Sequence, residues 1–424
     1  MKVGIYTLGC KVNLYESEYV ISLFQKQGYT ICPFDDYCDI YIINTCTVTN
    51  TSDLKSQKII RQAIKRNPQA CVVAMGCFIE ANQELDIPGV DIYIGTKNKS
   101  KVVEYVEEYY SNKKEQRETS PELASGFENM EIETFPGRTR AFVKIQDGCE
   151  NFCSYCIIPF VRGKCRSKDF HTVIEEISKL IKNGYKEIVL TGIHTGNYGV
   201  DINTSFGELL EAITSLEGLT RLRISSIEIT ELNSKVLESL KNRPMIANHL
   251  HIPLQAGSKE ILIAMNRKYD KDYFLNKVKE IRLIRPDISL STDVIVGFPG
   301  ETEEDFEESL AFIRQIAFSK VHVFPYSKRT GTVAADMDNQ VDDISKKVRV
   351  KKLLALSKKL EIDYMNKFIN KQADVLIEKV LDDSSIGHTS NYLLVKVNQV
   401  LARDKVVSVT ITDVDYPYCI GTVN

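Results

Sequence analysis

Short apolar runs alternate with amphipathic stretches along the first part of the chain. β-Branched runs at residues 3–8, 40–44, 71–75 and 91–94 predict strands, and helical periodicity predicts helices at 16–26, 52–66 and 101–110. Strands that alternate with helices in this way form a parallel sheet with helices on both faces. We therefore expect a doubly wound α/β domain over residues 1–112.

A polar and acidic stretch follows at residues 111–134, containing Pro121 and Gly126, and it predicts a linker. A second alternation then begins. Its expected helices include 171–182, 206–216 and 303–316, and its expected strands are 141–146, 187–190, 221–225, 249–252, 288–296 and 320–324. Six βα repeats fit an open, partial barrel better than a closed eightfold one. We assign this (βα)6 barrel to residues 135–366.

The last part of the chain changes pattern again. A lysine-rich helix is predicted at 345–367, and from residue 373 apolar and polar residues alternate. This alternation predicts a small β-barrel over residues 367–424. The fold class is therefore α/β, in three domains.

Composition restricts the class of protein. Apolar residues make up 43% of the 424 residues and charged residues 26%, which are globular proportions. With 54 Lys+Arg against 57 Asp+Glu, a nucleic-acid partner must be bound by a local basic surface. The eleven cysteines are an odd number and argue against a disulfide framework. No apolar run approaches a membrane span or a signal core, so we expect a cytoplasmic protein with reduced thiols and no membrane partner.

Cys149, Cys153 and Cys156 form a Cys-x3-Cys-x2-Cys motif just beyond a predicted strand. Three thiolates at this spacing bind three irons of a 4Fe–4S cube and leave the fourth iron open to a chelating ligand. A zinc knuckle or three structural thiols are the alternatives. Zinc sites usually recruit four ligands in paired spacings, and no partner pair is near in sequence.

This motif resembles that of the radical S-adenosylmethionine (SAM) superfamily. The resemblance implies that the open iron binds the amino and carboxylate groups of SAM, and that Tyr155 lies against the adenine. Active sites of βα barrels lie at the carboxyl ends of the strands. Polar residues recur at these strand ends, although each alone could be a helix cap or a turn. The candidate SAM contacts are Gly192, His194, Ser226, Glu228, Gln255 and Asp293.

Three further cysteines, Cys10, Cys46 and Cys77, each follow a predicted strand of the first domain. In a parallel sheet those strand ends share one edge, where ligands collect. We predict a second three-thiolate iron–sulfur site there, with buried packing thiols as the alternative. Of the other cysteines, we expect Cys71 to pack in the core and Cys165 to be structural.

The whole pattern resembles the methylthiotransferase family of radical SAM enzymes. The matching blocks are residues 9–13, 157–163, 251–258 and 293–302, and Lys11-Val12-Asn13 is most similar to the branch that acts on threonylcarbamoyladenosine in tRNA. The resemblance implies methylthiolation of carbon 2 of N6-threonylcarbamoyladenosine at position 37, with two 4Fe–4S clusters and with SAM as methyl donor and radical source. It implies no catalytic residue beyond the cluster ligands.

The resemblance also implies partners: the tRNA anticodon stem-loop, an electron donor of flavodoxin or ferredoxin type, and a sulfur donor. The tail resembles a TRAM domain, a small RNA-binding barrel, with Tyr392, Lys396, Arg403 and Lys405 as a candidate face. Phosphates need clustered cations. The candidates are residues 345–359 of the lysine-rich helix and a set near the cysteine motif: Arg138, Arg140, Lys144, Arg162, Lys164, Arg166 and Lys168.

Two kinds of alternative remain open at this point. The same chemistry could act on isopentenyladenosine in tRNA or on an aspartate of a ribosomal protein. A noncatalytic iron–sulfur protein that binds RNA would carry the same thiols without cleaving SAM.

Overall fold

The computed structural model describes residues 1–119 and 126–424, so Pro121 of the expected linker lies outside the described residues. The chain divides into two compact units. Unit 1 consists of Met1–Ile132, Lys144–Asp169 and Ser327–Ala335, and unit 2 of Glu133–Val143, Phe170–Tyr326 and Asp336–Asn424. Each unit is described by itself.

Unit 1 contains a six-stranded sheet in the order β2-β1-β3-β4-β5-β6, and every neighbouring pair is parallel. The four expected strands are present as β1 (Lys2–Thr7), β3 (Ile40–Thr45), β4 (Cys71–Gly76) and β5 (Ile92–Ile94). Two three-residue edge strands, β2 (Thr30–Cys32) and β6 (Gln116–Glu118), were not expected. The expected linker is therefore wrong at its start, because β6 pairs with β5 and extends the sheet, and Arg117 lies over the Tyr93 ring at 3.8 Å.

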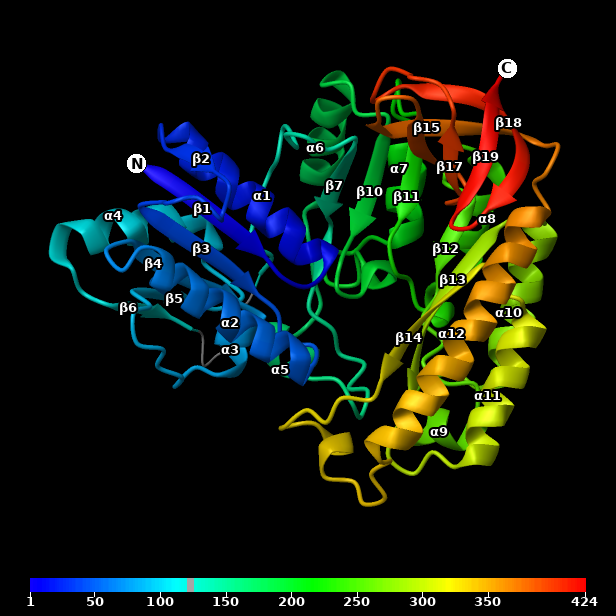
Figure 1. Cartoon of the computed structure of the whole chain (residues 1–424), viewed down its shortest axis with the longest axis horizontal. Helices are drawn as coiled ribbons and strands as arrows, with labels where there is room; N and C mark the ends of the chain where they lie inside the picture. Colours follow the sequence, from blue (N-terminus) through cyan, green and yellow to red (C-terminus); the bar gives the residue numbers. More distant parts are fainter. Residues whose placement is uncertain (120–125) are drawn as a thin grey trace. The chain divides into compact units, whose positions relative to one another are not determined.

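Helices cover both faces of this sheet (Figure 1). Ile40 and Ile42 of β3 pack with the helices α1 (Lys11–Lys26) and α4 (Val102–Asn112). Tyr41 and Ile43 point the other way and pack with α2 (Asn50–Arg66) and α3 (Cys77–Ala81). Because side chains alternate across a strand, a strand buried on both faces reads as a continuous apolar run. The doubly wound arrangement is confirmed.

Unit 2 contains the open barrel, as two three-stranded sheets in the orders β11-β10-β7 and β12-β13-β14. Parallel bridges from Leu222 to Ile246 and from Ser226 to His251 join them. The strands are β7 (Arg140–Lys144), β10 (Glu187–Thr191), β11 (Arg221–Ile224), β12 (His249–His251), β13 (Ser289–Val296) and β14 (Lys320–Pro325). The helices between and after them are α6 (Phe170–Lys182), α7 (Phe206–Thr214), α8 (Ser234–Asn242), α9 (Lys259–Ala264), α10 (Lys271–Ile284), α11 (Glu303–Ile316) and α12 (Asp343–Asn366). The six expected strands and the partial barrel are confirmed.

The end of the chain forms a closed barrel in the order β15-β16-β17-β19-β18, drawn in orange to red in Figure 1. Its strands are β15 (Gln372–Val380), β16 (Ser385–Thr389), β17 (Leu394–Val397), β18 (Val406–Asp415) and β19 (Tyr418–Val423). The alternating pattern places Val375, Val395 and Val409 in its core. The predicted small β-barrel is confirmed.

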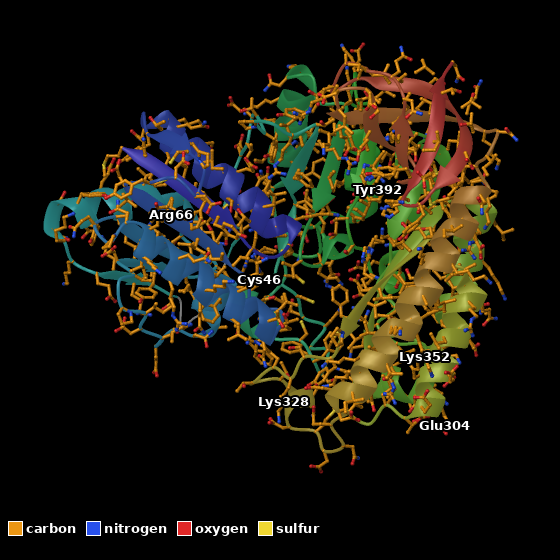
Figure 2. All side chains as sticks on the ribbon, in the orientation of Figure 1. Cys46, Arg66, Glu304, Lys328, Lys352 and Tyr392 are labelled. Carbon is orange, nitrogen blue, oxygen red and sulfur yellow. The ribbon has the colours of Figure 1, made fainter. Side chains whose placement is uncertain are left out.

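Arginines at the amino-terminal end of the open barrel join it to the small barrel. Glu187 is fully buried and pairs with Arg223 at 2.7 Å and Arg221 at 3.1 Å. Arg221 also donates to the carbonyl of Asp374 at 3.0 Å, and Arg223 lies 4.3 Å from the centre of the Tyr392 ring. Tyr392, labelled in Figure 2, therefore packs against Arg223 and His249 within unit 2 but stays partly exposed, and its place on an RNA-binding face remains a prediction.

Acid should weaken this junction. Burial alone would raise the pKa of Glu187, but Arg223 and Arg140 lower it to about 2. The Glu187 carboxylate thus stabilises the fold above its unfolded pKa near 4.5, and this contribution, about 3 kcal/mol, is lost as pH falls towards 2. We expect Glu187→Gln to remove most of this pH dependence in urea unfolding between pH 5 and 2, whereas the exposed Glu217→Gln leaves it intact. An unchanged profile in Glu187→Gln would contradict this account.

Candidate functional site

The first three predicted ligands lie at neighbouring strand ends, and we call Cys10, Cys46 and Cys77 the strand-end triad. They follow β1, β3 and β4, which are adjacent in the parallel sheet. Cys46, labelled in Figure 2, and Cys77 are buried, and Cys10 is exposed. The structure thus brings these three residues to one sheet edge, as the strand pattern predicted.

Two glycines allow the strand ends to approach each other. Gly9 has φ +98°, and a Cβ on it would lie 3.0 Å from the sulfur of Cys46. Gly76 has φ +103°, and a Cβ on it would lie 2.6 Å from the side-chain oxygen of Asn44. An L side chain at either position would be strained and would collide. Glycine is therefore required immediately before Cys10 and Cys77.

Asn13 is buried next to this sheet edge and hydrogen-bonds to the ends of two of its strands. Its amide nitrogen donates to the carbonyls of Leu8 at 2.8 Å and Thr45 at 2.9 Å. Its amide oxygen accepts from the Cys10 thiol at 3.7 Å. Asn13 is the last residue of the Lys11-Val12-Asn13 motif, so the motif has a structural role at the strand-end triad.

A buried charge network lies beside the strand-end triad. It consists of Glu16, Lys99, Lys144, Asp147, Arg162 and Arg166, all buried. The Arg162 guanidinium is 3.0 Å from Glu16 and 2.9 Å from Asp147, and Lys144 is 2.9 Å and 2.7 Å from the same carboxylates. Four cations face two carboxylates, which leaves an excess of two positive charges in a place where uncompensated charge is costly.

Arg162 is the member of this network that contacts a thiol of the strand-end triad. Its Nε donates to the sulfur of Cys77 at 3.3 Å, and one of its terminal nitrogens donates to the side-chain oxygen of Asn13 at 2.9 Å. Burial raises the pKa of Cys77 to about 11, against the opposing effect of Arg162 and Lys99. Metal binding displaces such a thiol proton, and a thiolate-ligated cluster would offset the excess charge. The residues present therefore fit an anionic iron–sulfur cluster.

Cys149, Cys153 and Cys156 form the loop triad, which also belongs to unit 1. Their loop lies between β8 (Gln146–Asp147) and α5 (Ile158–Arg162), and antiparallel pairing of β8 with β9 (Arg166–Ser167) closes it. All three thiols and Tyr155 are half-buried, so they are accessible to a cofactor. This fits a cube with one open iron.

A segment from later in the chain touches both loops. Residues Ser327–Ala335 return to unit 1 after β14. Arg329 pairs with Asp53 and hydrogen-bonds Thr47, the residue that follows Cys46. The backbone of Ala334 donates to the carbonyl of Ser154 in the loop triad at 2.7 Å. Ser327–Ala335 thus holds the loops of both triads.

The candidate SAM contacts of unit 2 lie where the barrel strands end. The Ser226 backbone pairs with His251, and the backbone of Gln255 donates to the carbonyl of Asp293 at 2.9 Å. Gly192 directly follows β10. His194 and Glu228 are held in ion pairs with Glu231 and Arg267. Asp293 is likewise paired, with His251 at 3.1 Å. The structure therefore leaves Ser226 and Gln255 as the more open of these candidates, and the role of the whole set with SAM stays a prediction.

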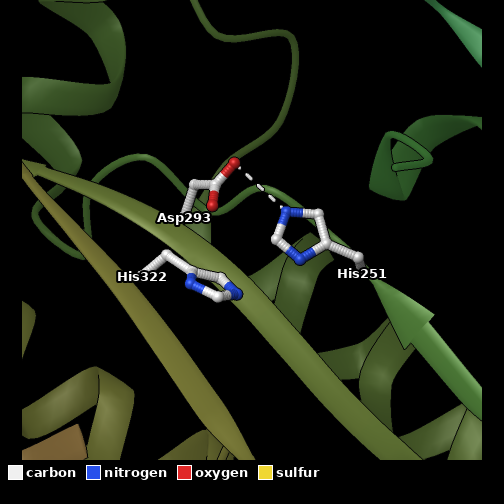
Figure 3. A group of neighbouring side chains, drawn as sticks. All are labelled: His251, Asp293 and His322. Atoms are coloured by element: carbon white, nitrogen blue, oxygen red, sulfur yellow. Dashed lines mark ion pairs between the residues drawn. The ribbon is translucent and has the colours of Figure 1, made fainter. Parts of the chain in front are cut away.

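Sequence reasoning missed a group of three side chains on adjacent barrel strands, which we call the histidine–aspartate group: His251, Asp293 and His322 (Figure 3). The Nε2 atom of His251 lies 3.1 Å from a carboxylate oxygen of Asp293. One side-chain N or O atom from each of the three residues lies within 4.8 Å of the others. The sequence shows that each of the three residues lies in a predicted strand. It does not show the strand register, which places His251 opposite Ser291 and Asp293 opposite His322.

The expected phosphate contacts near the loop triad are mostly wrong. Of the set we named, four side chains are buried and occupied within the fold: Lys144, Arg162, Arg166 and Lys168. Arg140 is half-buried and pairs with Glu187 and Glu378. Only Arg138 and Lys164 of that set are exposed. In the lysine-rich helix α12, two of the candidate cations are paired within the fold. Arg349 pairs with buried Glu301, and Lys352 (Figure 2) pairs with Glu303 and Glu307. The exposed lysines of this helix include Lys347, Lys351 and Lys359.

Comparison with known proteins agrees with this site. The Radical SAM superfamily model matches residues 143–313, and the model described as uncharacterized protein family UPF0004 matches residues 2–95. The radical SAM methyltransferase TsrM from Kitasatospora setae has a similar fold, with a TM-score of 0.58 at 12% identity over 79% of this chain and 77% of that one. The fold and thiols define a radical SAM enzyme, which uses a 4Fe–4S cluster and SAM.

Relatives with high identity define the family more closely. Threonylcarbamoyladenosine tRNA methylthiotransferase MtaB of Bacillus subtilis (strain 168) is 43% identical over 427 residues, covering 98% of this chain and 95% of that protein. tRNA-2-methylthio-N(6)-dimethylallyladenosine synthase of Carboxydothermus hydrogenoformans is 35% identical, covering 89% and 86%. The chain belongs to the radical SAM tRNA methylthiotransferases of the MtaB type and is a transferase. Among the described residues, no helix is both long and apolar enough to span a membrane.

Proposed function

We propose that this enzyme adds a methylthio group to carbon 2 of N6-threonylcarbamoyladenosine at position 37 of tRNA. The observation that carries the proposal is the strand-end triad beside a buried excess of positive charge, which suits a second, sulfur-carrying cluster. The substrate is supported by relatives of the same name at 43%, 38% and 37% identity, whereas the dimethylallyladenosine synthase is at 35%.

Each part of the chain has its own task in this proposal. The loop triad would hold the cluster that binds SAM, and the strand-end triad would hold the second cluster. Together these cofactors supply the radical and the sulfur that an unreactive C–H bond requires. Arg162 stabilises the thiolate form of Cys77 through its hydrogen bond, and Asn13 holds the backbone next to Cys10 and Cys46 through the carbonyls of Leu8 and Thr45. Tyr155, Gly192, Ser226 and Gln255 are our candidates to orient SAM, whereas His194, Glu228 and Asp293 are held in ion pairs and are the weaker candidates.

The enzyme is also expected to bind RNA and protein partners. The tRNA anticodon stem-loop binds with the target base out of its stack, as base-modifying enzymes require. Exposed lysines of α12, with Arg138 and Lys164, are the candidate phosphate contacts. An electron donor of flavodoxin or ferredoxin type, a sulfur donor and a cytoplasmic location complete the proposal. We retain 1–112, 135–366 and 367–424 as functional domains.

Nucleoside analysis by mass spectrometry tests the substrate. In a strain lacking the gene, 2-methylthio-N6-threonylcarbamoyladenosine should disappear from tRNA and its unmethylthiolated precursor should accumulate. Reintroducing the gene should restore the product. If the methylthio group is lost from isopentenyladenosine instead, the substrate is isopentenyladenosine in tRNA. If neither methylthiolated nucleoside is lost, the ribosomal-protein substrate is favoured.

Removing one thiol of the strand-end triad tests the second cluster. Cys46→Ala should lower the iron content from about eight to about four per chain. It should keep reductive SAM cleavage and stop sulfur insertion, because the loop triad is untouched. Iron analysis and chromatography of deoxyadenosine and product nucleoside measure these effects. Cys32→Ala, which alters a half-buried thiol on β2, is the matched control. Unaltered product formation in Cys46→Ala would contradict the proposed role of the strand-end triad.

A further inference from the structure

We propose that the histidine–aspartate group forms a subsite that binds the polar N6 substituent of the target adenosine, with Asp293 as hydrogen-bond acceptor and His322 as hydrogen-bond donor. This inference rests on the proposed function. It assigns to His322, which lies outside the blocks that match the whole family, the task of distinguishing a threonylcarbamoyl group from a hydrocarbon substituent.

The three side chains lie on one face of three adjacent strands (Figure 3). In the register, His251 is opposite Ser291 and Asp293 is opposite His322, and Ser291 and Asp293 are two residues apart on β13. Directly opposed residues in a sheet, and residues two apart on one strand, share a face. The other face of β13 is fully buried, with Leu290, Thr292, Val294 and Val296 at 0–1% exposure. The histidine–aspartate group therefore lies on the more open face.

A chain of polar contacts fixes the orientation of Asp293. Ser291 Oγ is 2.9 Å from His249 Nε2 and 2.9 Å from His251 Nδ1, and His251 Nε2 is 3.1 Å from Asp293. These contacts hold the Asp293 side chain in one orientation. Its side chain is 29% exposed, so it has acceptor capacity for a ligand.

His322 has no hydrogen bond to any residue within 1–119 or 126–424, and it is exposed. Its ring centre is 5.6 Å from that of His251. Partial desolvation of the ring by its neighbours, and then the nearby His251, lower the pKa of His322 below its ordinary value near 6.5. The ring is thus neutral near pH 7, with one N–H donor available beside the acceptor of Asp293.

These two groups complement a threonylcarbamoyl substituent. That substituent has hydroxyl and amide hydrogens, which suit Asp293, and carbonyl and carboxylate oxygens, which suit the N–H of His322. An isopentenyl substituent offers no polar atom, so it would leave the N–H of His322 without a partner in the complex. A site built for hydrogen bonding strongly rejects an analogue that lacks the matching polar atoms. Location agrees, because Ser226 and Gln255 at the carboxyl ends of the strands lie next to His251 and Asp293.

A divalent cation is the competing occupant, because two histidines and a carboxylate form a known metal-binding set. Both ring nitrogens of His251 already have partners, Ser291 and Asp293. Coordination of a metal would break the pair with Asp293. The geometry therefore favours an organic ligand with its own hydrogen-bond donors and acceptors.

The test uses the full-length reconstituted enzyme and two anticodon stem-loop RNAs, one with threonylcarbamoyladenosine and one with isopentenyladenosine at the target position. We expect His322→Leu to lower kcat/KM for the first RNA by about 10- to 100-fold and to weaken its Kd, because a hydrogen bond to a charged group is lost. It should raise relative activity on the second RNA. His322→Gln retains a donor and should recover most of the loss, and His171→Leu, an exposed histidine on α6, is the control.

Each outcome decides one question. If the wild-type enzyme modifies neither RNA or only the isopentenyl one, the proposed function fails. If the wild type modifies the threonylcarbamoyl RNA and His322→Leu gives the same kcat/KM and Kd, this inference alone is overturned. Stoichiometric divalent metal other than cluster iron, lost in His322→Leu, would also overturn it in favour of a metal site. Iron content and melting temperature equal to wild type exclude misfolding of the variant as the cause of a lost activity.

Discussion

Cys153→Ala is expected to abolish reductive cleavage of SAM, so that deoxyadenosine release falls to the level without enzyme. Cys153 is half-buried on the loop between β8 and α5, outside both apolar cores of unit 1, so the fold should be retained. With two thiolates the cube loses its third protein ligand, and with it the iron geometry that chelates SAM. Anaerobic reconstitution, reduction and chromatography of deoxyadenosine measure the effect.

The control for this variant is Cys32→Ala, which removes a thiol of similar burial elsewhere in unit 1. It should cleave SAM at the wild-type rate. Circular dichroism of both variants checks that the fold is kept. Continued SAM cleavage by Cys153→Ala would refute the assignment of the loop triad.

Glu16→Gln should be the most destabilising single change in unit 1. Burial alone would raise the pKa of Glu16, but Arg162, Lys144 and Lys99 hold it well below its usual range, so the carboxylate is charged. An amide in its place leaves these cations buried without their shared partner. Breaking a buried ion pair from one side costs about 3–5 kcal/mol. Urea unfolding of the iron-free protein at neutral pH measures the change.

An exposed pair provides the comparison. Glu208 and Lys235 are 2.8 Å apart at the surface of unit 2, where solvent screens the interaction, so Glu208→Gln should leave stability nearly unchanged. The sign of the pH dependence adds a second readout. Because the folded pKa of Glu16 is depressed, its contribution is present near neutral pH and is lost on acidification, and Glu16→Gln should remove that loss. Equal stability of wild type and Glu16→Gln would contradict the charge network.

The parts of the fold with strong local signals could be predicted from sequence. β-Branched runs such as 40–44 and 71–75 are buried on both faces, so their apolar pattern is continuous and unambiguous. The strand ends in turn located Cys10, Cys46 and Cys77. β2 and β6 could not be found, because each has only three residues and none of them is fully buried, so neither leaves an apolar run in the sequence.

The charge network lay beyond sequence reasoning for a different reason. Charge is visible in a sequence, but burial is not, so Arg162 and Lys144 were interpreted as phosphate contacts. Arg162 meets Cys77 from 85 positions away and Glu16 from 146. Only the folded chain brings such distant residues together. The histidine–aspartate group was missed likewise, because its residues are joined by strand register.

The discontinuous make-up of unit 1 has a practical consequence for dissecting this enzyme. A fragment ending at Ile132 would contain all three strand-end thiols and Glu16, yet it would lack Arg162, Lys144 and Asp147, which come from Lys144–Asp169. It would also lack Arg329, which binds beside Cys46. The part of the chain that we propose to carry the sulfur is therefore not an independent module: it is completed only after the ribosome has synthesised most of the polypeptide.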